Sequence, residues 1–177
     1  MDKNTTTLKD TYGAAYDNYK KGNLKTAETL CYKILSIDPN FIQSKILLAN
    51  ISAKNKDFVN TKKLLSEALD MDSKNISVLN NLGTVCKQLG ETKNALNYYK
   101  KVIEIDPNNP NAYYNLGATC YDLGQLKEAK VSLQKATVIK PNFALPFFVL
   151  GNVHSDLKEY EKAISNYKKA IEINNNL

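Results

Sequence analysis

A 34-residue period constrains the fold of this chain more strongly than any other feature of its sequence. Gly83, Gly117 and Gly151 lie one period apart, and aligning them fixes a register that runs from residue 8 to residue 177 without a gap. The register leaves a short N-terminal tail, residues 1–7, and defines five blocks: residues 8–41, 42–75, 76–109, 110–143 and 144–177. Self-similarity at a period of roughly 20–50 residues indicates a repeat architecture rather than one central core.

Small side chains recur at two positions of the blocks. The eighth residue of the successive blocks is Ala15, Ala49, Gly83, Gly117 and Gly151. The twentieth is Ala27, Thr61, Ala95, Ala129 and Ala163. Because small residues allow two helices to approach closely, we expect these positions to lie where the two helices of a pair touch.

Apolar residues within a block follow helical spacing. In the third block, one stripe runs through Leu79, Leu82, Val85, Cys86 and Leu89, and a second runs through Ala95, Leu96, Tyr99, Val102 and Ile103. Gly90 separates the two stripes, and Asp106-Pro107 follows the second, where proline disfavours further helix. Each block therefore predicts a helix, a turn and a second helix. Helices of about a dozen residues are marginal alone, so the blocks must stack and share their apolar faces.

The pattern resembles the tetratricopeptide repeat family over residues 8–177. The fourth block carries the family's marker residues most completely: Tyr113, Leu116, Gly117, Gly124, Ala129, Ala136 and Pro141. The resemblance implies an all-α fold, a right-handed superhelical solenoid of antiparallel helix pairs, with residues 8–177 as a single domain. The second block departs from the family pattern at Lys45, Lys56, Thr61 and Ser73, so we expect it to pack least well.

The charge of the chain gives no signal for nucleic-acid binding. All 24 basic residues are lysine, against 18 acidic residues, and no block carries a concentrated basic patch. Arginine, which supplies bidentate contacts to phosphate and guanine, is absent from the sequence. Lys100, Lys101, Lys168 and Lys169 fall on the second helices, on the face that is convex and solvated in the family. We therefore expect no nucleic-acid partner.

No segment of the sequence predicts membrane insertion or secretion. The longest near-apolar run, Phe143 to Gly151, is far shorter than a membrane span and contains Pro146. The first seven residues lack the apolar region of a secretory signal, and three cysteines do not make a closed disulfide set. These features favour a reducing, cytoplasmic location.

Residue types that support catalysis or metal binding are few and widely spaced. Cys86, Cys120 and His154 share the eleventh position of three blocks. Stacked helix pairs separate equivalent positions by roughly 16–20 Å, whereas zinc binds its ligands at about 2.0–2.3 Å, so we expect three core residues. Negative charge at the start of a helix suits its dipole, which explains the acids there without a catalytic role; they are Glu91, Glu128, Glu159 and Glu161. The sequence predicts no catalytic residue, metal site or cofactor, and no enzyme.

In the family that this chain resembles, the first helices of the pairs line a concave groove that binds extended peptides. The resemblance places ten residues there as candidate contacts: Asn50, Asn80, Asn81, Thr84, Asn111, Tyr114, Asn115, Tyr121, Phe148 and Asn152. Asn81 and Asn115 stand one period apart, and each amide offers both a donor and an acceptor to an extended peptide backbone. The aromatic residues among the ten would supply apolar anchors. We expect Tyr12, Tyr16 and Tyr19 at the groove or the N-terminal edge, where a partner or self-packing would cover them.

The leading hypothesis is a non-catalytic protein-protein interaction scaffold that binds an extended peptide or a partner helix. Binding of chaperone C-terminal tails is not expected, because that subgroup needs basic residues where Ile46, Asn111 and Asn115 stand in one register, and the other registers also fail. An alternative follows from the Asn-Leu-Gly motifs, which resemble the substrate-recruiting repeat arms of O-linked N-acetylglucosamine transferases and related sulfotransferases. A third interpretation is self-assembly through the apolar residues that the fifth block leaves uncovered: Ala163, Ile164, Tyr167, Ala170 and Ile171.

Overall fold

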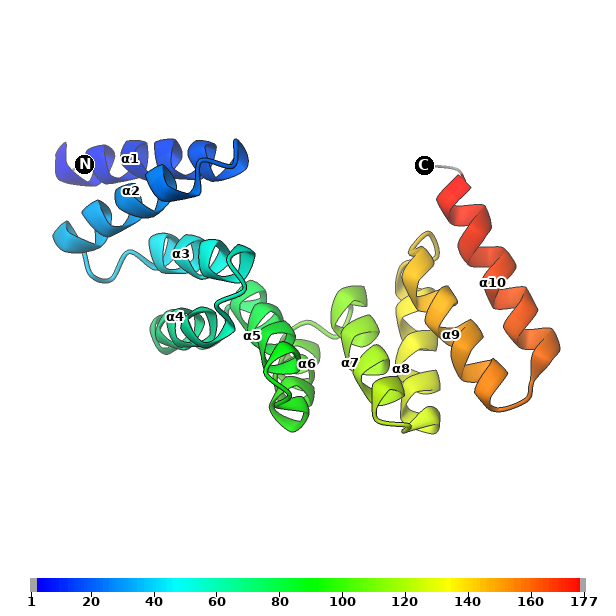
Figure 1. Cartoon of the computed structure of the whole chain (residues 1–177). Helices are drawn as coiled ribbons and strands as arrows, with labels where there is room; N and C mark the ends of the chain where they lie inside the picture. The colour runs from blue at the N-terminus through cyan, green and yellow to red at the C-terminus, as the bar shows by residue number, and fades with distance from the viewer. Residues whose placement is uncertain (1–2, 176–177) are drawn as a thin grey trace. The chain divides into compact units, whose positions relative to one another are not determined.

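The computed structural model describes residues 3–175, and the side chains of residues 7–175. This part of the chain is helical apart from short turns and contains no strand (Figure 1). Its helices are α1 (Lys3–Lys20), α2 (Leu24–Ile37), α3 (Ile42–Lys54), α4 (Phe58–Met71), α5 (Ile76–Gln88), α6 (Thr92–Ile105), α7 (Pro110–Asp122), α8 (Leu126–Ile139), α9 (Ala144–Asp156) and α10 (Tyr160–Asn175). Each predicted block holds one helix pair, and α1 begins ahead of its block, so the predicted tail is helical from Lys3. The all-α fold of helix pairs is confirmed.

The helices form two compact units, Met1–Leu89 with α1 to α5 and Gly90–Leu177 with α6 to α10. In the first unit α1 packs against α2 and α3 against α4, while α2 contacts α3 and α4 contacts α5. In the second unit α7 packs against α8 and α9 against α10, while α6 contacts α7 and α8 contacts α9. Each unit is therefore a stack in which helices contact their neighbours in sequence, as in a solenoid.

The turns inside the helix pairs share one backbone geometry. The fifteenth residue of every block has a positive φ: Gly22 84°, Lys56 60°, Gly90 76°, Gly124 70° and Lys158 61°. Glycine adopts this left-handed conformation without steric cost, whereas any other L-residue is strained by roughly 1–2 kcal/mol. Lys56 stands where the family usually has glycine, but the turn keeps the same backbone conformation.

Two of the polar residues that distinguish the second block have partners. Thr61, which replaces alanine, is 3% exposed, and its hydroxyl donates a hydrogen bond to the carbonyl of Asp57 at 2.7 Å. The Nζ atom of Lys45, at a large apolar position of the pattern, lies 2.6 Å from Oε2 of Glu67. These two polar groups are thus paired at positions where most other blocks have apolar residues.

The outer surface carries the charges that the register predicted there. Lys100, Lys101, Lys168 and Lys169 are all exposed. Within the described residues, no helix combines the length and the apolar character that crossing a bilayer requires.

Small residues set the spacing between paired helices, as the sequence predicted. Every residue at the eighth and twentieth block positions is buried. A Cβ atom on Gly117 of α7 would lie 2.7 Å from Cγ of Leu133 and 3.1 Å from the carbonyl oxygen of Ala129, both on α8. A Cβ atom on Gly151 of α9 would overlap the ring of Tyr167 on α10. These two helix pairs pack too closely to accept a side chain at the glycine.

We predict that Gly117→Ala and Gly151→Ala each lower the free energy of unfolding by about 1–3 kcal/mol, because the added methyl group forces the paired helices apart. Gly13→Ala is the matched control, since Gly13 also lies inside a helix but a Cβ there has no neighbour within 4 Å. The control should raise the stability by up to about 1 kcal/mol through helix propensity. Urea unfolding followed by circular dichroism measures all three, and equal effects would contradict the close-contact explanation.

Candidate partner-binding surfaces

Three of the predicted groove residues meet at one cavity of the first unit. Asn50 of α3 and Asn81 and Thr84 of α5 line a space of about 110 Å³ between α3, α4 and α5. The other lining residues are mostly apolar: Ala53, Phe58, Thr61, Leu65, Val85 and Gln88. The cavity therefore combines amide groups at its wall with a mostly apolar lining.

Asn80 and Asn81 are neighbours in α5 but have different surroundings. The side-chain amide of Asn80 donates a hydrogen bond to the carbonyl of Ile76 at 3.1 Å, and Oδ1 of Asn80 is buried without a hydrogen-bond partner among the described residues. The hydroxyl of Thr84 donates to the carbonyl of Asn80 at 3.1 Å. The amide donor of Asn80 is therefore used inside the helix, whereas Asn81 lines the cavity.

The predicted groove residues of α7 differ in exposure. Asn111 is exposed, while Tyr114 and Asn115 are half-buried. The ring of Tyr114 packs against Phe143, with ring centroids 5.3 Å apart and an interplanar angle of 59°. Burial, and to a smaller extent the charge of Asp122, raises the pKa of Tyr114, so its hydroxyl stays a hydrogen-bond donor at neutral pH. The carbonyl of Asn115 accepts a hydrogen bond from the hydroxyl of Thr119 at 2.7 Å.

Phe148 and Asn152 of α9 converge on Tyr167 of α10. The hydroxyl of Tyr167 donates a hydrogen bond to Oδ1 of Asn152 at 2.8 Å, and its ring centroid lies 5.9 Å from that of Phe148. Tyr121 of α7 has a raised pKa, chiefly through burial and next through a hydrogen bond with Asp156. Sequence reasoning did not include Tyr167 among the site residues, although Gly151 opposite it indicated that α10 approaches α9 closely.

The residues predicted to lie uncovered at the last helix pair divide into two groups. Ala163 and Ala170 are buried, with 3% and 5% exposure, so this part of the prediction is wrong because α9 covers them. Ile171 is 58% exposed, and Phe148 is 52% exposed. Beside them lies a cavity of about 290 Å³ whose lining residues come from both helices: Ala144, Leu145, Phe148, Tyr167, Ala170, Ile171 and Asn174.

A larger cavity of about 360 Å³ lies where α6, α7 and the start of α8 meet. Its lining residues are Leu96, Lys100, Leu116, Cys120, Gln125, Lys127, Glu128, Val131 and Ser132. None of them is a predicted groove residue. The sequence carried a signal for this space, because Ser132 stands at a block position where the first three blocks have Leu30, Leu64 and Tyr98.

The three potential metal ligands at the eleventh block position are core residues, as predicted. Cys86, Cys120 and His154 are buried, with 0%, 5% and 4% exposure. The described residues hold no group of three or more histidines, cysteines and acids placed to bind a metal ion. Burial raises the pKa of the Cys31 thiol to about 11 and raises that of Cys120 as well, so both remain protonated.

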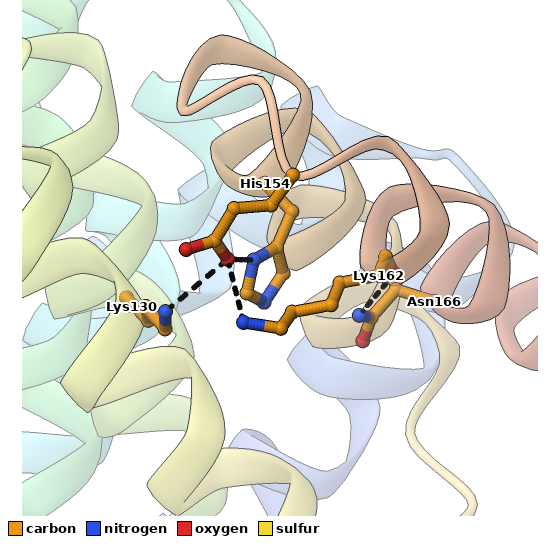
Figure 2. Close-up of polar contacts among 5 residues, drawn as sticks. Lys130, His154, Lys162 and Asn166 are labelled. Atoms are coloured by element: carbon orange, nitrogen blue, oxygen red, sulfur yellow. Dashed lines mark hydrogen bonds and ion pairs between the residues drawn. The ribbon is translucent and has the colours of Figure 1, made fainter.

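His154 has a charged partner that the sequence did not reveal. Three side chains surround the carboxylate of Glu159. Nδ1 of His154 lies 2.5 Å from Oε2, Nζ of Lys162 3.2 Å and Nζ of Lys130 3.5 Å. Figure 2 shows His154, Lys162 and Lys130 converging on one carboxylate. The hydrogen bonds from His154 and then Lys162 lower the pKa of Glu159 to about 2. Glu159 therefore links α8, α9 and α10 through its side chain, and does more than complement a helix dipole.

Glu91 of the third block also differs from the expectation for these acids. It stands before α6, but its side chain makes no cap hydrogen bond to the helix and accepts one from the amide of Asn94 at 2.9 Å. The helices that do have side-chain N-caps use Asp57, Asn75 and Asn109. Asp57 and Glu91 stand at the same block position, so the shorter aspartate caps its helix there and the glutamate does not.

We predict that Glu159→Gln destabilises the second unit at neutral pH and makes its stability depend less on pH under acidic conditions. Because the pKa of Glu159 is lowered from 4.5 to about 2, the unfolded chain binds this proton more readily than the folded chain. Its contribution is therefore complete above pH 4.5 and is lost as the pH falls towards 2. Thermal unfolding across this range measures the effect, with Glu161→Gln, an exposed acid on α10, as the control. A Glu159→Gln variant that keeps the wild-type slope would contradict the assignment.

Two family models match the sequence. The one described as Tetratricopeptide repeat matches residues 110–143 and 144–177, and the one described as TPR repeat matches residues 83–123. The first two ranges coincide with the fourth and fifth predicted blocks. No curated protein matches the sequence.

Several solved structures share the fold. MamA is 21% identical, with 92% of this chain and 95% of that chain covered and a TM-score of 0.83. YrrB, described as a TPR protein with an unusual peptide-binding site, is 23% identical, with 97% and 92% covered and a TM-score of 0.76. PilF of Pseudomonas aeruginosa is 19% identical, with 97% and 78% covered and a TM-score of 0.87. At these identities the likeness shows the fold and does not carry over the residues of a site.

Proposed function

Because the chain belongs to the tetratricopeptide repeat family, we propose that it is a non-catalytic interaction scaffold whose first helices bind an extended peptide or a partner helix. The observation that carries this proposal is the cavity shared by Asn50, Asn81 and Thr84. A small apolar side chain of a peptide enters the cavity, and the amides beside it bind the peptide backbone. An asparagine amide both donates and accepts, so it pairs with a backbone of any sequence.

The second unit has candidate contact residues of its own. Asn111, Asn115 and Asn152 offer polar contacts, and Tyr114, Tyr121 and Phe148 offer aromatic ones. Phe148 is half-exposed, so it has apolar surface that a partner can bury. The peptide-binding site named for YrrB, a protein of the same fold, supports a binding function for this chain without indicating its ligand.

Peptide display against the full chain tests the proposal. Peptides selected on the wild-type protein should bind Asn81→Ala plus Asn115→Ala at least about tenfold more weakly, because each lost amide leaves a buried peptide group without its hydrogen bond. Asn97→Ala plus Asn142→Ala is the matched control, since both residues are exposed and lie outside the first helices. Circular dichroism confirms that each variant folds. Equal affinity of the selected peptides for the wild type and the first variant would contradict the groove assignment.

A specific surface also favours a second candidate function, self-association through α9 and α10. Leu145, Phe148 and Ile171 are each about half exposed beside the cavity of about 290 Å³. Exposed apolar side chains gathered around a hollow are typical of protein-protein contact sites. A second copy of the chain that presents the same patch would bury all of them in a two-fold contact.

Sedimentation over a range of concentrations tests the self-association. The wild-type mass should rise with concentration, and Ile171→Lys should keep the chain monomeric, because the contact would bury an unpaired ammonium group. Ile37→Lys is the matched control, since Ile37 has the same 58% exposure and lies on α2. A wild-type protein that stays monomeric throughout would rule out this candidate.

A further inference from the structure

Three tyrosines of α1 form a continuous stack, which we call the tyrosine ladder: Tyr12, Tyr16 and Tyr19. The ring centroids of Tyr12 and Tyr16 are 6.4 Å apart with an interplanar angle of 23°, and those of Tyr16 and Tyr19 are 6.4 Å apart at 24°. Tyr12 also contacts Phe41, with centroids 5.7 Å apart. Tyr16 remains 42% exposed. The helical spacing of the three residues places them on one face of α1, and that face is incompletely covered.

Two ammonium groups lie over the rings of the ladder. Nζ of Lys20 is 5.0 Å from the ring centroid of Tyr16, and Nζ of Lys54, which comes from α3, is 4.1 Å from that of Tyr19. Helices α1 and α3 contact each other in the first unit, and Figure 1 shows both helices. Neither lysine forms an ion pair with a carboxylate among the described residues. The ladder and these two lysines together are called the ladder surface.

The described acids of α1 form no ion pair with the two lysines of this surface. At about 100° per residue, Asp10 and Asp17 are roughly 160° and 140° around the helix from Tyr12. Asp17 is only roughly 60° around the helix from Lys20, yet no ion pair joins them. The ammonium groups of Lys20 and Lys54 are therefore not paired with an acid of α1.

The chemistry of the ladder surface favours a carboxylate over a nucleic-acid base. An ammonium group donates hydrogen bonds and accepts none. The pKa of Tyr12 is raised, chiefly by burial, so its hydroxyl also remains a donor at neutral pH. A base needs an open ring face for stacking, but an ammonium group already covers one face of Tyr16 and of Tyr19. The ladder surface therefore offers hydrogen-bond donors and the partly exposed side chain of Tyr16.

We propose that the ladder surface binds an acidic, extended segment of a protein partner, whose carboxylates pair with Lys20 and Lys54 and whose apolar side chains lie against the exposed part of Tyr16. The proposal rests on the scaffold function proposed above and specifies the partner chemistry at one end of the first unit. The sequence left open whether a partner or self-packing covers these three tyrosines, and the proposal assigns them a partner of stated chemistry.

Fluorescence anisotropy with the full chain tests the proposal. The probe is a labelled peptide that alternates glutamate with proline, which stays extended, and its reference peptide has glutamine in place of glutamate. We expect the acidic peptide to bind at least about fivefold more tightly than the neutral one, and Lys20→Gln plus Lys54→Gln to remove that difference. Tyr16→Ala should weaken both peptides, because both lose the apolar contact.

Lys33→Gln plus Lys63→Gln is the control for net charge, since both lysines are exposed, on α2 and α4 of the same unit. It should change the affinity less than about twofold. Equal binding of the acidic and neutral peptides would overturn the proposal, and so would an equal loss in the control. Tighter binding of an oligothymidylate with the same dependence on Lys20 and Lys54 would also overturn it in favour of a nucleic-acid surface.

The display-selected peptides separate this proposal from the scaffold function on which it rests. If they lose affinity for Asn81→Ala plus Asn115→Ala but not for Lys20→Gln plus Lys54→Gln, and the acidic peptide binds no better than the neutral one, the ladder proposal fails and the groove assignment stands. If the acidic peptide binds through the two lysines while display yields no groove ligand, the ladder proposal stands and the groove assignment fails.

Discussion

The close approach of the two helices in each pair is the interaction on which the rest of this structure depends. Gly117 lies against Leu133 and the carbonyl of Ala129, and Gly151 lies against the ring of Tyr167, with no room for even one additional carbon atom. Such contacts gain dispersion energy across the whole length of two short helices that would not be stable alone. Because each helix buries one side in this way, stacking of neighbouring pairs covers the remaining apolar stripe. The first helices keep a face that the solenoid itself does not use.

The polar groups on those free faces explain why the chain is suited to binding. In the first unit, amides surround an apolar cavity between α3 and α5, and the tyrosine ladder with its two lysines lies on α1 and α3. In the second unit, Tyr114 and Tyr121 of α7 have raised pKa values, so their hydroxyl groups remain protonated. These features suit the binding function proposed above. The cluster around Glu159 instead links α8, α9 and α10.

The sequence predicted what repeats and failed where an interaction occurs only once. The small residues at the eighth and twentieth block positions were predictable because every block needs the same close contact. The pairing of His154 with Glu159 was not, because no other block has a histidine at that position. The turn at Lys56 shows that backbone geometry persists without glycine. Asn80 and Asn81 are the same residue type but point in different directions from α5. Asn80 therefore bonds to its own helix, and Asn81 lines the cavity.

The central claim is that stability arises from contacts between neighbouring helices and not from a common core, and native-state hydrogen exchange of Gly151→Ala tests it most directly. The variant disturbs one helix pair, so the account predicts faster amide exchange in α9 and α10, a smaller change in α8, which contacts α9, and unchanged protection in α1 to α4. A similar loss of protection in every helix of both units would show that the chain unfolds as one cooperative body, and would contradict the account.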